Sequence, residues 1–176
     1  PHDARLPPLH PVRKAAMNVI ELLDHAARRT PDATAIIDGP YGKERVISFA
    51  DLDAWSRQIA TLFARAGVGA GDGVVILIPM SAPLYAVIAA TLRLGAVTVF
   101  IDPKSAAAQL DRCRAALPLR AFVGTPMACL YRCLSSDFRA IRPAFVSHGW
   151  FPGATYLGAA RDVPPVKHTV TGLDTA

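Results

Sequence analysis

The amino-acid sequence predicts an α/β fold in which helices flank a doubly wound, mostly parallel sheet, with a β-hairpin preceding it. The main observation is the stretch from residue 74 to 103, where residues 74–78 and 97–101 predict buried strands and residues 84–94 predict a helix between them. Short apolar runs separated by glycine and proline then repeat this alternation. Strands that alternate with helices favour a parallel sheet, because each parallel connection needs a crossover.

Residues 1–16 lie outside this pattern. They are rich in proline and basic residues and show no hydrophobic period, so they predict a flexible leader. The ordered pattern begins next to Met17, and we interpret Met17 as a candidate natural start. The predicted domain runs from residue 17 to 161, and the aperiodic residues 162–176 predict a frayed tail or a linker.

A first helix is predicted after Asn18. This residue is a favourable N-cap, and Glu21 stands three positions later as its capping-box partner. Arg28 and Arg29 fall in the last turn, where positive charge complements the helix dipole. Pro31 marks the end of the helix, since the residue before a proline is biased away from helical backbone angles.

A β-hairpin and a long helix come next. Residues 33–37 and 45–48 predict two strands joined by a turn at residues 39–43 (GPYGK). Ser48 is expected to cap the following helix together with Asp51, three positions later. The apolar face of this helix is expected to consist of Leu52, Trp55, Ile59, Leu62, Phe63 and Ala66.

The stretch from residue 74 to 101 also has a feature of a membrane-spanning helix, because Arg93 is its only charged residue. A spanning helix needs about 20 continuous apolar residues. Pro79, Pro83 and Gly95 divide this stretch into pieces that are each shorter than that. The strand–helix–strand interpretation is therefore preferred, and no transmembrane segment is expected.

The alternation continues beyond residue 103. The expected elements are a helix capped by Ser105 and ended by Pro118, a third strand at residues 121–123, a helix from Thr125 to about Leu134, and a fourth strand at residues 144–147. From residue 148 onward, glycine, proline and small residues weaken the pattern. No further strand is predicted there.

Composition and charge describe a chain with a sizeable core and a basic surface. Of the 176 residues, 52% are hydrophobic and 19% are charged, which disfavours global disorder. The net charge is +5 and the isoelectric point is about 9.5. The basic residues are scattered and aromatic residues do not alternate with them, so we expect a solvated surface and no nucleic-acid site.

The three cysteines, Cys113, Cys129 and Cys133, argue against a secreted disulfide scaffold because their number is odd and none are closely paired. Cys129 and Cys133 share a face of the predicted helix. No second pair completes a metal site, so buried small side chains are the favoured interpretation. With no signal-peptide pattern at the start, these features favour a cytoplasmic location.

Catalytic and cofactor-binding motifs are missing from the sequence. It contains no G-x-x-x-x-G-K-[ST], H-E-x-x-H, C-x-x-C or G-x-S-x-G, and no G-x-G-x-x-G follows a strand. Residues 67–71 (GVGAG) follow a helix and precede a strand, so they predict a turn rather than a phosphate loop. His25 is expected on the surface. His148 follows a strand, where parallel sheets hold ligands, but it has no partner, so we assign no catalytic, cofactor-binding or metal-binding residue.

The order of the remaining sequence segments indicates the protein family better than the missing motifs do. Residues 28–37 (RRTPDATAII), 48–53 (SFADLD) and 67–103 (GVGAGDGVVILIPMSAPLYAVIAATLRLGAVTVFIDP) follow one another in the chain. This ordered set resembles the N-terminal part of the adenylate-forming superfamily, which comprises acyl-CoA synthetases, aryl- and aminoacyl-adenylating enzymes and luciferase. Asp72 and Asp102 match family positions, where turn chemistry is the expected role.

Residues 110–134 (LDRCRAALPLRAFVGTPMACLYRCL) point to one branch of this superfamily. They look like a run found in bacterial long-chain-fatty-acid–CoA-ligase-like proteins and in olefin-pathway β-lactone synthetases. The family's TSGSTGxPK loop, YGxTE segment, ribose-binding aspartate and C-terminal lysine have no counterpart in this sequence. No functional residue of the family can therefore be carried over.

The resemblance implies a partial N-terminal domain of an acyl-adenylate-forming ligase, inactive by itself. The parent enzyme would use ATP and Mg²⁺ on a carboxylate such as a fatty acid, with CoA or another acceptor, and β-lactone synthesis is the alternative within the family. A second hypothesis is a non-catalytic or vestigial module that binds the remainder of a ligase, or another copy of itself, through an exposed apolar edge. A generic nucleotide-binding domain is the third hypothesis, disfavoured because no phosphate loop follows the strands.

Overall fold

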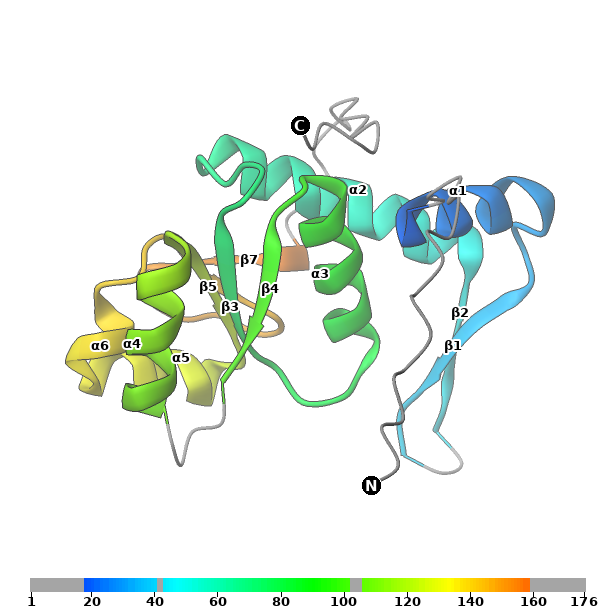
Figure 1. Ribbon diagram of the computed structural model, residues 1–176. Coiled ribbons are helices and arrows are strands. Elements are labelled where there is room, and N and C mark those ends of the chain that lie inside the picture. The colour runs from blue at the N-terminus through cyan, green and yellow to red at the C-terminus, as the bar shows by residue number, and fades with distance from the viewer. Residues whose placement is uncertain (1–17, 41–42, 102–105, 159–176) are drawn as a thin grey trace, which may run out of the picture.

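The structure is a computed structural model that describes residues 18–40, 43–101 and 106–158 (Figure 1). Five parallel strands form the main sheet in the order β4-β3-β5-β6-β7, and β1 and β2 form a separate antiparallel pair. The elements are α1 (Val19–Arg29), β1 (Thr34–Asp38), β2 (Arg45–Ser48), α2 (Phe49–Arg65), β3 (Gly73–Leu77), α3 (Ala82–Arg93), β4 (Val97–Phe100), α4 (Ala106–Ala116), β5 (Leu119–Gly124), α5 (Pro126–Leu134), α6 (Ser136–Arg139), β6 (Ala144–Val146) and β7 (Ala154–Tyr156). The predicted α/β class is confirmed.

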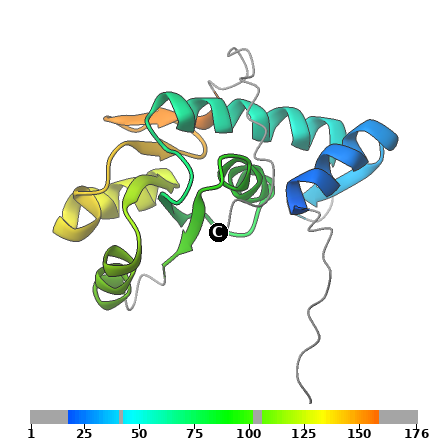
Figure 2. The ribbon, with the colours of Figure 1, turned by 45° about the horizontal axis from the view of Figure 1, so that its top comes forward.

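Helices cover both faces of the main sheet, so the domain has three layers. On one face, α2 and α3 pack on Val74 and Ile76 of β3. On the other face, α4, α5 and α6 pack on Val75 of β3 and Phe122 of β5. Neighbouring residues of a strand alternate between the two layers because successive side chains point to opposite faces. Helix α2 also packs against α1, which lies at the outer end of the domain (Figure 2).

The predicted strand–helix–strand unit is present, with one correction. Val74, Val75 and Ile76 are buried in the centre of the sheet, as expected. The second strand, β4, was also predicted to be buried, and this is wrong: Val97 is 41% exposed and Phe100 is 56% exposed. The reason is topological, because β4 lies at the edge of the sheet and the chain then crosses to the opposite side of β3.

The predicted helix caps are confirmed in part. The Asn18 side chain accepts a hydrogen bond from the Ile20 amide at 3.2 Å, whereas Glu21 is not its capping-box partner in the structure. Ser48 and Asp51 do form the predicted capping box at the start of α2. These contacts satisfy backbone amides that have no partner inside the helix.

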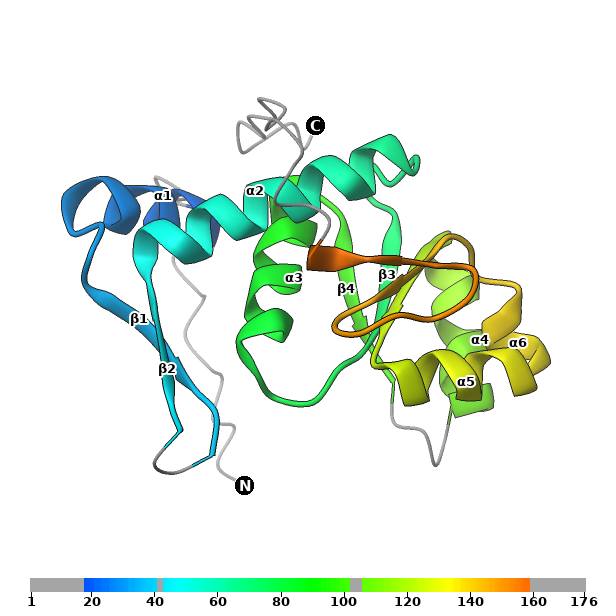
Figure 3. The same cartoon turned by 180° about the vertical axis from the view of Figure 1, so that it is seen from behind.

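The hairpin stands apart from the main sheet, with α3 between them and α2 running from the end of β2 across the top of α3 (Figure 3). Strands β1 and β2 are antiparallel, and Ile36 lies opposite Ile47. Both residues pack against the layer formed by α2 and α3. The hairpin is therefore an addition to the helical layer rather than an extension of the sheet.

The segment after residue 134 contains two elements that were not predicted, α6 and β7. Strand β7 has the sequence ATY between turns, so it offers no apolar run that a pattern could detect. Helix α5 begins as predicted, with Thr125 as its N-cap. Ser105, the leader at residues 1–16 and the tail at residues 162–176 lie outside the described residues.

A membrane-spanning segment was not expected, and the structure agrees as far as it is described. None of the helices in the described ranges has both the length and the apolar character needed to cross a bilayer.

Candidate functional site

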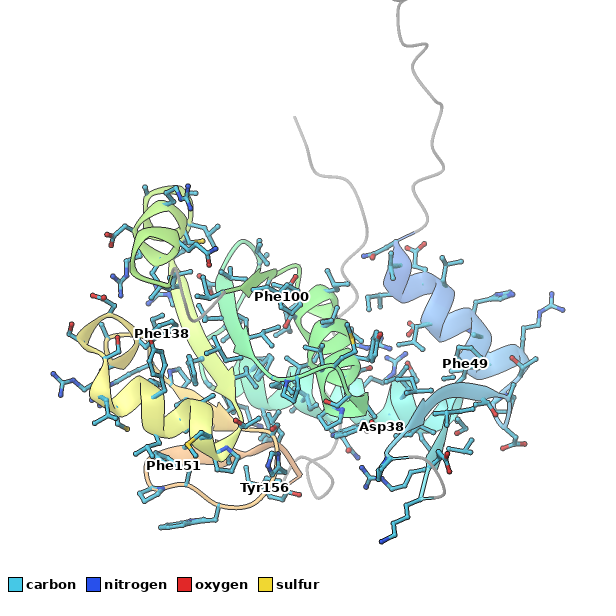
Figure 4. The ribbon with its side chains drawn as sticks, turned by 90° about the horizontal axis from the view of Figure 1, so that it is seen from below. Asp38, Phe49, Phe100, Phe138, Phe151 and Tyr156 are labelled. Atoms are coloured by element: carbon cyan, nitrogen blue, oxygen red, sulfur yellow. The ribbon has the colours of Figure 1, made fainter. Side chains whose placement is uncertain are left out.

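The topology of the main sheet defines one crevice at its carboxyl edge. The connection after β3 leads to α3 on one face, whereas the connection after β5 leads to α5 on the other face. The two connections therefore diverge where β3 and β5 end. Open α/β sheets bind ligands at such switch points. Figure 4 looks onto this edge, with Phe100 labelled at the end of β4.

A pocket of about 420 Å³ lies at this crevice and is the candidate functional site. Its lining comes from three segments: residues 76–79 after and within β3, residues 100–101 at the end of β4, and residues 125–131 at the start of α5. The volume falls in the range typical of small-molecule sites.

The lining of this pocket is almost entirely apolar. Leu77, Phe100 and Met127 contribute hydrocarbon and thioether surface, and Thr125 and Tyr131 carry the hydroxyl groups. The Thr125 hydroxyl already accepts a hydrogen bond from the Ala128 amide at 3.1 Å, as the cap of α5. Among the described residues, the lining contains no carboxylate, imidazole, thiol or ammonium group, so this part of the pocket can hold an apolar group.

Some large apolar side chains of the pocket segments are exposed. Met127, which lines the pocket, is 72% exposed, and Met80, next in the chain to the lining residue Pro79, is 76% exposed. Along α5, exposed apolar residues recur at helical spacing: Met127, Leu130, Tyr131 and Leu134. We call these four residues the α5 stripe. A contiguous exposed apolar surface of this kind marks an interaction site more often than a solvated face.

His148 lies where the sequence placed it, beyond the carboxyl end of β6, and is exposed. Its Nδ1 is 3.1 Å from the Ser147 hydroxyl oxygen. Within the described parts of the chain, no group of three His, Cys, Asp or Glu side chains could hold a metal ion. His148 therefore lies at the carboxyl edge of the sheet, with the Ser147 hydroxyl as its neighbour. His25 is exposed on α1, as expected.

The cysteine prediction is half correct. Cys129 is buried, and burial raises the pKa of its thiol to about 11, which makes it unreactive near neutral pH. Cys133 was also predicted to be buried, and this is wrong, because it lies in the last turn of α5 and is exposed.

The glycine segment at residues 67–71 forms a turn, as predicted. Gly67 and Gly71 adopt positive φ angles of 85° and 79°, which favour glycine. A carboxylate oxygen of Asp72 accepts a hydrogen bond from the Gly69 amide at 2.9 Å. This supports the expected turn role of Asp72.

A buried ion cluster was missed by sequence reasoning. Arg93 of α3 is 5% exposed and pairs with Asp24 of α1, at 2.8 Å, and with Asp53 of α2. Arg57 joins both carboxylates at 2.9 Å, and the Ser56 hydroxyl accepts from Arg93. Burial raises the pKa of Asp24, but hydrogen bonding and positive charge from Arg93 outweigh it, and the pKa stays below its usual value. The cluster joins three helices.

Comparisons with known proteins agree with this fold. A sequence model of the family described as "AMP-binding enzyme" matches residues 23–140. The olefin beta-lactone synthetase of Xanthomonas campestris pv. campestris is 31% identical over 147 residues, covering 80% of this chain and 24% of the relative. The 4-coumarate–CoA ligase 5 of Oryza sativa subsp. japonica is 39% identical over 72 residues, covering 41% of this chain and 13% of the relative.

Among solved structures, a protein from Rhodopseudomonas palustris CGA009 assigned as a long-chain-fatty-acid CoA ligase matches with a TM-score of 0.67. Its sequence identity is 16%, and the match covers 85% of this chain and 37% of the other. At this identity the likeness shows the fold alone. The chain spans about a quarter or less of the curated relatives described above.

Proposed function

The chain belongs to the AMP-binding enzyme family, and from this we propose that it is part of an ATP-dependent ligase that activates a carboxylate as an acyl adenylate. The family match covers residues 23–140 and confirms the resemblance found in the order of the sequence segments. The second step of such a reaction transfers the acyl group from AMP to an acceptor. CoA is the proposed acceptor, and the protein is proposed to act in the cytoplasm.

A fatty acid is the proposed carboxylate. The observation that carries this choice is the apolar pocket of about 420 Å³ at the carboxyl edge of β3, β4 and β5. An alkyl chain bound there would leave water for apolar surface, and each buried methylene group contributes about 0.8 kcal/mol. Phe100, Met127 and Tyr131 would contact the chain.

The pocket does not fit the other components of the reaction. The described residues of its lining are apolar and provide no cation or free amide for a triphosphate and no carboxylate for Mg²⁺. The sequence contains no TSGSTGxPK loop. We therefore derive no adenylation step from these residues, and we propose that the 176-residue chain is inactive alone, with ATP and Mg²⁺ held by other segments of the full enzyme.

Exchange of labelled pyrophosphate into ATP in the presence of fatty acids tests this function. The purified chain is expected to give no exchange above background. A polypeptide that joins the chain to the sequence encoded downstream is expected to give fatty-acid-dependent exchange. Exchange by the isolated chain would contradict the proposal that ATP and Mg²⁺ are held by other segments of the enzyme. An absence of exchange by the longer polypeptide would contradict the ligase assignment.

β-Lactone synthesis is a second candidate within the same chemistry. It is favoured by the 31% identity to the olefin beta-lactone synthetase over 80% of this chain. In that case a hydroxyl group of the substrate itself would take the acyl group, and no CoA would be consumed. Analysis of products with a β-hydroxy fatty acid, with and without CoA, separates the two.

The non-catalytic module remains the alternative from another class. The α5 stripe supports it, because an exposed apolar helix face can dock a partner without any chemistry. Sequencing of the DNA beyond the codon for Ala176 separates the two classes. A downstream reading frame that encodes a phosphate loop favours the ligase, and a stop codon at that point favours the module.

A further inference from the structure

A second pocket, of about 560 Å³, lies at the amino edge of the sheet, opposite the crevice. It is bounded by the end of α5, by the end of α6 and by the starts of β6 and β7. Its lining combines apolar and small residues with Cys133, Thr155 and three arginines: Arg132, Arg139 and Arg142. We call this the arginine pocket. It shares no residue with the apolar pocket and has no part in the function proposed above.

Arg132 is the fixed member of the arginine pocket. It is 8% exposed, and its Nε and Nη2 donate to the Ile141 carbonyl at 3.2 and 2.8 Å. Nη2 also donates to the Arg139 carbonyl at 3.2 Å. The guanidinium carbon lies 5.8 Å from the centre of the Phe122 ring. These contacts hold one edge of the guanidinium group in a defined position at the wall of the pocket.

The positive charge in this pocket has no counter-ion in the described chain. The ion pairs among the described residues include none of Arg132, Arg139 and Arg142. The other buried arginine, Arg93, is paired with two carboxylates, as buried charges usually are. Burial lowers the pKa of Arg132, the neighbouring Cys133 opposes this, and the charge of Arg142 lowers the pKa further. Two neighbouring cations at one pocket therefore repel each other.

We infer that the arginine pocket binds a phosphate group, either as free phosphate or as a small phosphate ester. Guanidinium groups match phosphate oxygens with paired hydrogen bonds, and a dianion offsets more than one arginine, which a single carboxylate does not. The Thr155 hydroxyl at the same wall is a further donor. The volume leaves room for an organic group attached to the phosphate.

Cys133 provides a local reporter for this site, because it is exposed and lines the pocket. The rate of Cys133 alkylation by iodoacetamide is measured by mass spectrometry of its peptide, at constant ionic strength so that screening does not change. Inorganic phosphate and glycerol 3-phosphate are the two probes, and sodium chloride is the control. The half-exposed Cys113, outside the pocket, is the internal reference.

Phosphate binding is expected to slow Cys133 alkylation saturably, by about threefold or more at a concentration several times the Kd, and to leave Cys113 unchanged. Protection by both probes would identify free phosphate as sufficient. Protection by glycerol 3-phosphate alone would identify an ester as the ligand. The inference is overturned if neither probe protects Cys133 beyond sodium chloride.

Substitution of the two exposed arginines of the pocket tests the inference without disturbing the fold. Arg132→Gln would also break the hydrogen bonds to two carbonyl groups, so Arg139→Gln and Arg142→Gln are the informative variants. Each is expected to reduce the protection, and the double variant to abolish it. Arg120→Gln, which removes an exposed arginine outside the pocket, is expected to keep it. Full protection in the double variant would also overturn the inference.

Discussion

Asp38, at the end of β1, caps helix α3 from a distance of 44 residues along the chain. Its Oδ2 accepts a hydrogen bond from the Ala82 amide at 3.0 Å, whereas Ser81, the N-cap residue, donates its hydroxyl to the Pro79 carbonyl instead. The hairpin thus supplies the capping group that the local sequence does not. This contact fixes the hairpin against the loop that follows β3, next to the apolar pocket (Figure 4).

Replacing Asp38 is therefore expected to weaken the domain. Asp38→Ala leaves the Ala82 amide without its acceptor and should lower the free energy of unfolding by about 1 kcal/mol, as for other helix caps. Asp38→Asn keeps an oxygen acceptor and should lose less than half of that. Urea unfolding measures both, with the exposed Asp111→Ala as a neutral control. An Asp38→Ala variant as stable as the control would show that the contact contributes nothing.

Substitution of Arg93 in the ion cluster should lower the free energy of unfolding by more than Asp38→Ala does. Arg93→Met would leave the half-buried carboxylates of Asp24 and Asp53 beside each other, with Arg57 as the remaining partner among the described residues. Removing one partner of a buried pair typically costs about 3–5 kcal/mol. Arg57→Met is the matched comparison. Because Arg57 is about one-third exposed, this substitution should lower the free energy of unfolding by clearly less than Arg93→Met. Equal losses in the two variants would mean that burial of Arg93 is not the deciding factor.

Stability should also depend on pH through Asp24. Its pKa is lowered in the folded state by hydrogen bonding and charge from Arg93, against the opposing effect of burial. A lowered folded pKa stabilises the protein above the unfolded pKa, which is about 3.9 for aspartate, and this stabilisation is lost as pH falls through the folded value. The Asp24→Asn variant should therefore be less stable than the unsubstituted protein at pH 7. Its free energy of unfolding should fall by a smaller amount between pH 5 and pH 2. An unchanged pH profile would contradict this assignment.

Much of the fold could be predicted from sequence because its signals are local. Buried β-branched runs, Gly95 at a helix end and the Ser48 cap each act within a few residues. The edge position of β4 could not be predicted, since VTVF has the same β-branched character as the buried β3. Only the crossover to β5, on the far side of β3, leaves β4 with a single neighbouring strand in the described sheet.

The sites depend on contacts between distant segments. Leu77, Phe100 and Tyr131 line the apolar pocket, yet each is an ordinary apolar residue in its own segment. In the ion cluster only the i, i+4 spacing of Asp53 and Arg57 is visible in sequence. The arginine pocket brings together residues from two helices, two strands and the loops before those strands. Only the packing of these elements places its arginines side by side, so a sequence pattern does not show the pocket.

A charge in the apolar pocket should weaken fatty acid binding. Phe100→Arg places a guanidinium group at the wall where the alkyl chain is proposed to lie, and because Phe100 is 56% exposed the domain should still fold. Binding of a fluorescent fatty acid should weaken by about tenfold or more, since an apolar chain cannot satisfy the charge. Val97→Arg, on the same edge strand but outside the pocket, should bind normally. Equal affinity of the Phe100→Arg variant and the unchanged chain would exclude this pocket as the acyl site.

The α5 stripe should make the isolated chain self-associate. Leu134 is 80% exposed at one end of the stripe, and Met127 is 72% exposed at the other. Burying such side chains against a second copy removes apolar surface from water, at about 25 cal/mol per Å². Light scattering coupled to size-exclusion chromatography should show a mass that rises with concentration, and Met127→Lys with Leu134→Lys should restore the monomer. Val46→Lys, on the exposed face of the hairpin, is the matched control and should leave association unchanged. A monomer at every concentration would mean that α5 has no affinity for its own copy and would leave the remainder of a ligase as the proposed occupant of the stripe.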